Sequence, residues 1–280
     1  MQVYPTSNSL QQALSKKRKG NSIGFVPTMG ALHQGHLSLI EEAKKHNEIV
    51  VVSIFVNPTQ FDNKEDLKKY PRTLAADKRL LESVNCDVLF APTAEDIYQN
   101  SIESSEFNFD GLEFEMEGKH RRGHFDGVGT IVKRLFEIVE PTNAYFGEKD
   151  FQQLQIIKKL VEKYQIPTKI IGCKIYREKD GLAMSSRNTR LTKQYRDAAP
   201  FIYQTLKKAQ IMFKTESATT VDSWVHKEFI KSKLLNLEYF EIANANTLKT
   251  IFHKRKGNKY RGFIAVFAGD VRLIDNIALN

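Results

Sequence analysis

The feature that most constrains the fold is an alternation, over about the first 175 residues, of short apolar runs with amphipathic segments. The clearest apolar run, Glu48–Val56, is rich in β-branched residues, which favour buried strands. The segment His36–His46 instead gathers its leucine, isoleucine and alanine side chains on one helical stripe, opposite charged ones. Strands that are apolar on both faces and separated by amphipathic helices indicate a parallel sheet covered on both sides. We therefore predict an α/β fold with a doubly wound, Rossmann-like parallel sheet.

The same pattern recurs along this part of the chain. Further strands are expected at Ser22–Pro27, Asp87–Phe90, Ala144–Phe146 and Thr168–Tyr176, and further helices at Pro71–Val84, Val128–Val139 and Phe151–Tyr164. The glycine pattern G-x-G-x-x-G does not follow the first of these strands, which disfavours dinucleotide binding of the usual kind.

The pattern changes after residue 176. Two helices are expected first, and then the strands of a small antiparallel sheet, at Gln194–Phe213, Val221–Lys233, Leu237–Ala243, Gly262–Ala268 and Val271–Ile274. A chain of 280 residues is long enough for two domains. We predict a Rossmann-like catalytic domain over residues 1–175 and a smaller α+β lid domain over residues 176–280.

The formal net charge of +9 lies entirely in the C-terminal part of the chain. Residues 1–175 carry 23 lysines and arginines against 23 aspartates and glutamates, whereas residues 176–280 carry 19 against 10. A neutral body with a basic C-terminal part suits a lid over an anionic small molecule such as a nucleoside triphosphate. A nucleic-acid-binding arm, or a merely solvated basic face at residues 253–256, are the alternatives.

Several features of the sequence predict a cytoplasmic location. The N-terminus has no apolar run followed by a small-residue cleavage site, and the longest apolar run, Ile49–Val56, is too short to span a bilayer. Cys86 and Cys173 are each flanked by apolar residues, so we expect buried thiols in a reducing compartment rather than a disulfide.

The first motif with chemical content is PTMGALHQGH, which begins at Pro27 and joins a predicted strand to a predicted helix. Ligands bind α/β sheets at the carboxyl ends of strands, and the N–H groups at the start of a helix favour an anion. His33 and His36 flank a glycine and are able to donate hydrogen bonds to that anion. A surface loop with two solvated histidines is the alternative. A zinc site is disfavoured because metalloprotease histidines are four apart, with an intervening glutamate.

Four further segments carry polar or charged side chains at predicted element ends. Gln60 follows a buried strand and suits a polar substrate; Lys149 and Asp150 follow another strand and suit a phosphate and a ribose. Two hydroxyls followed by an arginine, at residues 185–187, suit a triphosphate. The glycine-rich basic loop at residues 117–127 leads into a helix. Each segment has a purely structural alternative. The segment of Gln60 is then an ordinary turn, that of Lys149 and Asp150 a charged helix N-cap, residues 185–187 part of a polar hinge loop, and residues 117–127 a connector.

Taken together, these segments resemble one enzyme family. The stretches PTMGALHQGH, SIFVNPTQF, KKYPRT, GHFDGV, FGEKDFQQL and DGLAMSSRN match the pantothenate synthetase (pantoate–β-alanine ligase) family. The match runs from about Ile23 to Leu191 and extends weakly to GDVRLIDN near the end. The family belongs to the nucleotidyl-transferase superfamily with HIGH and KMSKS signatures. Here His33-Gln-Gly-His36 stands for the first signature and Met184-Ser-Ser-Arg187 for a degenerate second.

The resemblance implies an ATP-dependent condensation in two steps. The carboxylate of pantoate attacks the α-phosphorus of ATP, which gives pantoyl adenylate and pyrophosphate. The amine of β-alanine then attacks the activated carbonyl and releases pantothenate and AMP. The resemblance further implies magnesium alongside ATP, a homodimer, and neither nucleic acid nor membrane among the partners.

The resemblance also assigns roles to individual residues. Catalysis is expected from His36, His33, Lys149 and Arg187. ATP is expected to contact Met29, Gly30, Ala31, Leu32, His33, Gln34, Gly35, His36, Gly147, Glu148, Lys149, Asp150, Tyr176, Met184, Ser185, Ser186 and Arg187. Pantoate and β-alanine are expected at Gln60, Gln153, Asn57 and Met29, and Asp77 is the expected protein contact of magnesium.

The sequence departs from the family pattern at one position, and two other functions are alternatives to the one that the resemblance implies. Arg122 replaces the proline of the family's Arg-Pro-Gly-His-Phe sequence, which frees the backbone of that loop. Another nucleotidyl transferase of the same superfamily would keep the nucleotide on its product rather than release AMP. A nucleic-acid-binding module would bind DNA or RNA with a steep salt dependence. The family's chemistry gives no role to Lys254–Lys256.

Overall fold

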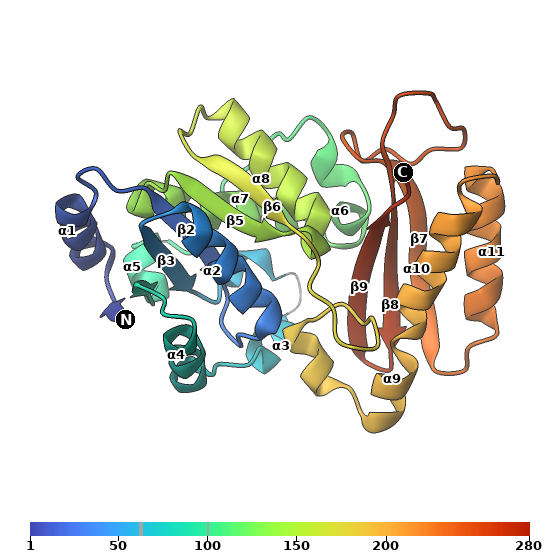
Figure 1. Cartoon of the computed structure of the whole chain (residues 1–280), viewed down its shortest axis with the longest axis horizontal. Helices are drawn as coiled ribbons and strands as arrows, with labels where there is room; N and C mark the ends of the chain where they lie inside the picture. Colours follow the sequence, from blue (N-terminus) through green and yellow to red (C-terminus); the bar gives the residue numbers. More distant parts are fainter. Residues whose placement is uncertain (62–63, 100) are drawn as a thin grey trace. The chain divides into compact units, whose positions relative to one another are not determined.

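The computed structural model describes residues 1–61, 64–99 and 101–280 (Figure 1). The chain separates into two compact units, residues 1–148 with 153–174, and residues 149–152 with 175–280. The short segment Lys149–Gln152 therefore groups with the second unit, although it precedes the predicted domain boundary. Within the described ranges, no helix is both long and apolar enough to cross a membrane.

In the described residues, the first unit holds a six-stranded sheet in the order β1-β4-β3-β2-β5-β6, and each neighbouring pair is parallel. The strands are β1 (Gln2–Tyr4), β2 (Ile23–Thr28), β3 (Ile49–Ile54), β4 (Val88–Phe90), β5 (Asn143–Gly147) and β6 (Lys169–Cys173). The helical segments are α1 (Ser7–Lys17), α2 (Gln34–His46), α3 (Lys64–Lys69), α4 (Leu74–Ser83), α5 (Ala94–Tyr98), α6 (Glu117–His120) and α7 (His124–Val139), with 3-10 turns η1 (Pro58–Gln60) and η2 (Leu112–Phe114). The turn η3 (Glu148–Asp150) and helix α8 (Phe151–Lys163) belong to the first unit except for residues 149–152.

Helices cover both faces of this sheet, as its apolar strands require. On one face, Val26 and Tyr145 pack with Leu37 of α2 in a buried cluster. On the other face, the ring of Phe25 meets the ring of Phe136 of α7 at 6.2 Å between centroids. Successive residues of a strand point to opposite faces, so the side chains of each strand pack against helices on both faces of the sheet. The predicted doubly wound parallel sheet is confirmed.

The direction of strand addition reverses between β2 and β5. The chain proceeds from β2 to β3 and β4 on one side, and from β5 to β6 on the other. β2 pairs with β3 at six positions but with β5 at only two, Gly24↔Asn143 and Phe25↔Ala144. The carboxyl-terminal ends of β2 and β5 therefore border a topological switch point, where open α/β sheets bind their ligands.

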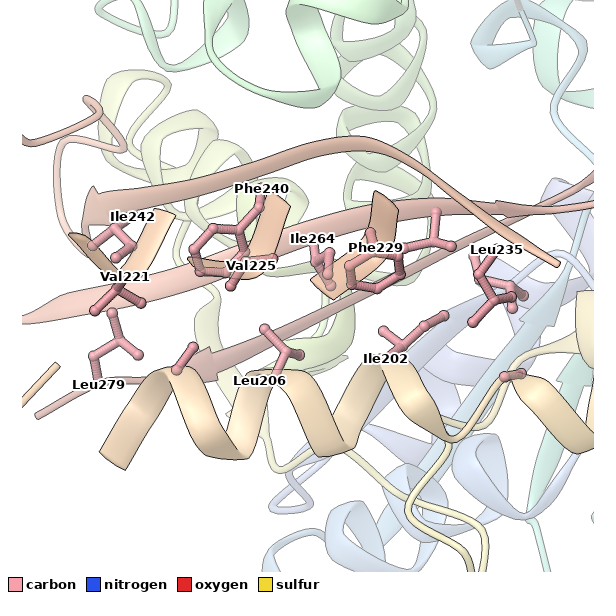
Figure 2. Close-up of a cluster of buried hydrophobic side chains, with 14 of the residues drawn as sticks. Ile202, Leu206, Val221, Val225, Phe229, Leu235, Phe240, Ile242, Ile264 and Leu279 are labelled. Atoms are coloured by element: carbon pink, nitrogen blue, oxygen red, sulfur yellow. The ribbon is translucent and has the colours of Figure 1, made fainter. Parts of the chain in front are cut away.

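The second unit contains, within the described residues, an antiparallel sheet in the order β7-β8-β9. Its strands are β7 (Leu235–Asn244), β8 (Tyr260–Ala268) and β9 (Val271–Ala278), and its helices α10 (Phe201–Met212) and α11 (Ala218–Ile230) lie along one face (Figure 1). Figure 2 shows the core of this unit, where Leu206 of α10, Val225 of α11 and Ile264 of β8 are fully buried. The α+β character predicted for the C-terminal part is confirmed.

Several element boundaries predicted from the sequence are wrong, and two of them lie at helix ends near prolines. The single helix expected over Gln194–Phe213 is two helices, α9 (Lys193–Ala198) and α10, which are separated around Pro200. Proline lacks a backbone N–H and its ring crowds the carbonyl four residues earlier, so the helix ends there. The helix expected from Pro71 begins only at Leu74, because Thr73 before it has the non-helical angles φ −125° and ψ 37°.

Candidate active site

The loop between β2 and α2 has a strained backbone that a buried carboxylate holds in place. Gly30 and Ala31 have positive φ angles of 79° and 48°. The N–H of Ala31 donates to Asp77 Oδ2 at 3.1 Å, and the N–H of Leu32 donates to Asp77 Oδ1 at 2.8 Å. Asp77 lies in the first turn of α4 and is 1% exposed. An alanine in the left-handed region is unfavourable on its own, so these two hydrogen bonds stabilise the turn.

His33 and His36 cap the N-terminus of α2 with their ring nitrogens. Nδ1 of His33 accepts from the N–H of Gly35 at 3.1 Å, and Nδ1 of His36 accepts from the N–H of His33 at 3.3 Å. The two rings stack at 4.0 Å between centroids. Because each Nδ1 is an acceptor, each neutral imidazole carries its proton on Nε2 and is a hydrogen-bond donor there. The capping therefore selects the tautomer that suits an anionic ligand.

Asp77 does not fit the predicted role of magnesium contact. Both of its oxygens accept hydrogen bonds from the loop N–H groups, and the hydroxyl of Thr73 lies 3.2 Å from each oxygen. A carboxylate with donors on both oxygens positions a loop rather than coordinating a cation. In the described part of the chain, no three histidine, cysteine, aspartate or glutamate side chains form a group able to hold a metal ion.

Replacing Asp77 by asparagine is expected to destabilise the protein by about 1–3 kcal/mol, because the new amide leaves a buried loop N–H without an acceptor. This cost corresponds to a fall of roughly 2–12 °C in the midpoint of thermal unfolding. A matched control is Asp110→Asn, since Asp110 is exposed and its carboxylate forms surface ion pairs with Lys159 and Lys163. Equal melting temperatures for the two variants would show that the carboxylate does not hold the loop.

Asn57 is buried at the end of β3 and serves as a hub of hydrogen bonds. Its Nδ2 donates to the carbonyl of Gly127 at 3.1 Å and to Oε1 of Gln60 at 3.2 Å. Its Oδ1 accepts from the hydroxyls of Tyr98 and Thr59. Burial raises the pKa of Tyr98, which keeps its phenol protonated as a donor. Asn57 is predicted to bind substrate, and in the structure its side chain orients the side-chain amide of Gln60.

Gln60 is held at its backbone as well as its side chain. Its carbonyl lies 2.8 Å from Nδ1 of His124 and accepts from Arg121 at 3.4 Å. Its side-chain amide lies 2.9 Å from the sulfur of Met29. Gln60 and Met29, both predicted at the pantoate site, are therefore neighbours. The sequence reasoning gave no role to Tyr98 or His124, although the GHFDGV stretch that contains His124 was available as a signal.

Gly127 allows α7 to approach η1 closely enough for these contacts. A Cβ atom there would lie 2.4 Å from the carbonyl oxygen of Thr59 and 2.7 Å from Cα of Gln60, both backbone atoms. In the same helix, a Cβ on Gly129 would meet ring atoms of Phe107 and Phe109 at 3.0 Å, and side chains can move aside.

We expect Gly127→Ala to displace η1 and to raise about tenfold the KM of the substrate that is predicted to bind at Gln60, an effect of about 1.4 kcal/mol within the usual cost of overpacking. Gly129→Ala is the matched control and is expected to change that KM little. Steady-state kinetics on both variants check the difference. An unchanged KM in Gly127→Ala would mean that η1 tolerates the displacement.

The end of β5 supplies a second predicted binding segment. Gly147 is its last residue, and Glu148 begins the η3 turn that leads into α8, where half-buried Gln153 lies in the first turn. Lys149 and Asp150, in the middle and at the end of this turn, group with the second unit. Nζ of Lys149 lies 3.7 Å from a carboxylate oxygen of Asp150, and the lysine side chain is only 18% exposed.

The remaining predicted residues lie in a tight loop of the second unit. The N–H of Met184 donates to the carbonyl of Tyr176 at 3.0 Å, which closes the loop into a narrow turn. Ser185 caps the 3-10 helix η4 (Ser186–Arg190) by accepting from the N–H of Arg187 at 3.2 Å. Asn188 ties this turn to Glu178 at 2.7 Å. The side chains of residues 184–187 are half-buried.

The sequence model of the family described as pantoate-beta-alanine ligase matches residues 2–278. A pantothenate synthetase of Flavobacterium psychrophilum is 61% identical over 259 residues, which is 92% of each chain. One of Christiangramia forsetii is 56% identical over the whole length of both chains.

Solved structures agree with the sequence relatives. The crystal structure of pantothenate synthetase from Thermus thermophilus matches with a TM-score of 0.92 and 37% identity, over 100% of this chain and 99% of that one. Pantoate-beta-alanine ligase from Francisella tularensis, complexed with beta-gamma ATP and beta-alanine, matches with a TM-score of 0.81 and 37% identity, over 100% and 98% of the chains.

Proposed function

This chain belongs to the pantoate–β-alanine ligase family, whose reaction is the formation of pantothenate, and we propose that it performs this reaction through a pantoyl adenylate. The proposal makes ATP, pantoate and β-alanine its three substrates. ATP and β-alanine are supported by the relative from Francisella tularensis, which was solved with beta-gamma ATP and beta-alanine.

The observation that carries the proposal is the N-terminus of α2 at the switch point of the sheet. This helix has 13 residues and begins directly after its N-cap residue His33, in the loop that follows β2. The dipole of the helix favours a phosphate at this end, and the Nε2–H groups of His33 and His36 supply donors.

In the first step, a carboxylate oxygen of pantoate forms a bond to the α-phosphorus, and the bond to the leaving pyrophosphate breaks. Charge develops on the phosphate oxygens, and donors fixed before the reaction stabilise it most effectively. His33 and His36 act at these oxygens, while Lys149, Arg187 and the hydroxyls of residues 185–186 hold the phosphates. Gly147 and Asp150 contact the ribose, and the other ATP contacts expected from the sequence, within residues 29–36 and 176–187, belong to the same proposal.

In the second step, the amine of β-alanine attacks the acyl carbon of the adenylate. The carbon–oxygen bond to AMP breaks, AMP leaves, and the amine loses a proton. Gln60, Gln153 and Met29 hold the pantoyl group, and Asn57 keeps the Gln60 amide in place through its 3.2 Å hydrogen bond. Both steps rest on positioning of reactants, so no protein nucleophile is needed.

Three finer expectations belong to the same proposal. Magnesium accompanies ATP as part of the nucleotide substrate, held by the phosphates rather than by Asp77. The protein works as a homodimer, which light scattering checks directly. It acts in the cytoplasm without nucleic-acid or membrane partners.

The test is isotopic. Pantoate labelled with ¹⁸O in its carboxylate is incubated with purified protein, ATP, Mg²⁺ and β-alanine, and the AMP is analysed by mass spectrometry. Transfer of one ¹⁸O atom to the AMP phosphate is expected, because an adenylate shares that oxygen between carbon and phosphorus. Pyrophosphate should form from ATP and pantoate without β-alanine. Unlabelled AMP would rule out the adenylate, and a nucleotide retained on the product would identify a nucleotidyl transferase.

A further inference from the structure

Two adjacent polar residues near the end of β9, Asp275 and Asn276, are buried within the second unit. They are 5% and 1% exposed and pair across the sheet with Ile264 and Phe263 of β8. Neighbouring residues of a strand point to opposite faces of the sheet, so their side chains reach different parts of the unit. A buried carboxylate and a buried amide each need partners, and the identity of those partners shows what the pair does.

Asp275 binds the base of the loop that carries the predicted phosphate-binding hydroxyls. Its two oxygens accept from Arg177 at 2.6 and 2.9 Å, in a bidentate pair. Arg177 also donates to the carbonyl of Gly181 at 3.1 Å and lies 3.7 Å from the ring centroid of Tyr203. The backbone of Arg177 also forms an isolated antiparallel β-bridge with Ala183, two residues before Ser185, the N-cap of η4. A partly buried guanidinium that is both bidentate and stacked on a ring restrains this loop.

Asn276 binds the other predicted phosphate-binding segment of the same unit. Its Nδ2 donates to the backbone carbonyl of Lys149 at 2.8 Å. Its Oδ1 accepts from Arg261, whose guanidinium lies 4.0 Å from the ring centroid of Phe151. The amide is therefore oriented by one partner and fixes the backbone of Lys149 through the other.

We infer that Asp275 and Asn276 are a pair of positioning residues for adenylation, because one strand fixes both Lys149 and the loop of residues 177–187. This inference rests on the proposed function. Neither residue is assigned a contact with substrate; each acts through a neighbour. A single rigid strand sets the spacing between the lysine and the hydroxyl–arginine loop, and a displacement of about 1 Å in such groups costs on the order of 100-fold in rate.

The test uses Asn276→Asp, which keeps the acceptor for Arg261 and replaces the donor to Lys149 by an oxygen. The full-length variant is assayed for pyrophosphate release from ATP and pantoate, and we expect kcat to fall about 10- to 100-fold. Asn280→Asp is the control, because Asn280 Nδ2 also donates to a backbone carbonyl at 2.8 Å, that of Asn258. The control is expected to keep wild-type kcat.

A double-mutant cycle separates positioning from general destabilisation. In a Lys149→Ala background, Asn276→Asp is expected to cause little further loss, since it acts through Lys149. Arg177→Lys keeps the charge but loses the bidentate geometry, so it should lower kcat in the otherwise wild-type protein. In an Arg187→Ala background, the same substitution should cause little further loss of kcat.

Two results would overturn the inference while the proposed function stands. One is a wild-type kcat in Asn276→Asp. The other is a loss of kcat in both double variants that equals the product of the losses in the single variants. Absence of pyrophosphate release from the wild-type protein would instead contradict the proposed function.

Discussion

Replacing His36 by alanine is expected to slow formation of the adenylate at least ~100-fold while the protein stays folded. In the proposed mechanism, the Nε2–H of His36 donates to a phosphate oxygen whose charge grows in the transition state. The hydrogen bond from the N–H of His33 to Nδ1 holds the ring in the tautomer that can donate. Donors fixed in this way contribute more to the transition state than to the bound substrate.

Two further variants separate the donor of His36 from its capping role. His36→Asn offers an oxygen near the position of Nδ1, so it keeps the cap but loses the donor. His36→Gln offers an amide near the position of Nε2, so it keeps the donor but loses the cap. We expect the asparagine variant to melt near the wild-type temperature yet to be as slow as alanine, and the glutamine variant to recover part of the rate with a lower melting temperature.

The measurement is single-turnover pyrophosphate release with ATP and pantoate. His46→Ala is the control on the same helix, because His46 is exposed and pairs only with Glu42 among the interactions described for its side chain. It should turn over normally. A fast asparagine variant would remove His36 from the chemistry and leave it as a helix cap.

Replacing Lys149 by alanine is expected to cause a loss of similar size, again at least ~100-fold in adenylation. The lysine is a compact positive charge, its side chain is mostly shielded from water, and its carbonyl is held by Asn276. A charge in such a place interacts with phosphate more strongly than one in open water. Lys149→Arg keeps the charge but moves it, so it should recover only part of the rate.

The control for this prediction is Lys158→Ala, which removes an exposed lysine from α8. Pyrophosphate release is measured over a range of ATP concentrations. A rise in the KM for ATP with unchanged kcat would show that Lys149 binds ground-state ATP and transition state equally. A fall in kcat would place its interaction in the transition state. Wild-type kinetics would end its assignment to the site.

Much of the candidate site follows from local sequence. His33 and His36 are in one short motif at a strand-to-helix junction, so their joint position at a helix N-terminus is predictable from a few residues. The same holds for Gly147 with Glu148, and for Ser185 with Arg187. The family they indicate is confirmed by its relatives, whereas the individual roles remain predictions for kinetics to decide.

Contacts between segments that are distant in the sequence cannot be predicted from local sequence in the same way. The family resemblance implied a magnesium contact for Asp77, whereas in the structure its carboxylate accepts from backbone N–H groups 45 and 46 residues away. The bond from Asn276 to Lys149 spans 127 residues. A carboxylate or an amide is equally able to bind a cation, a backbone group or a substrate, and its residue type does not distinguish these partners.

The sequence by itself determined the parallel sheet, its two helix layers, the α+β C-terminal part and the segments that carry chemistry. These depend on the period of apolar residues and on local turn signals, which are properties of neighbouring residues. The tertiary structure alone decided which buried polar groups pair, and hence that Asp77, Asn57 and Asn276 orient other residues. The reason is that a buried polar side chain takes the partner that strand order and register bring within about 3 Å, however far away that partner lies along the chain.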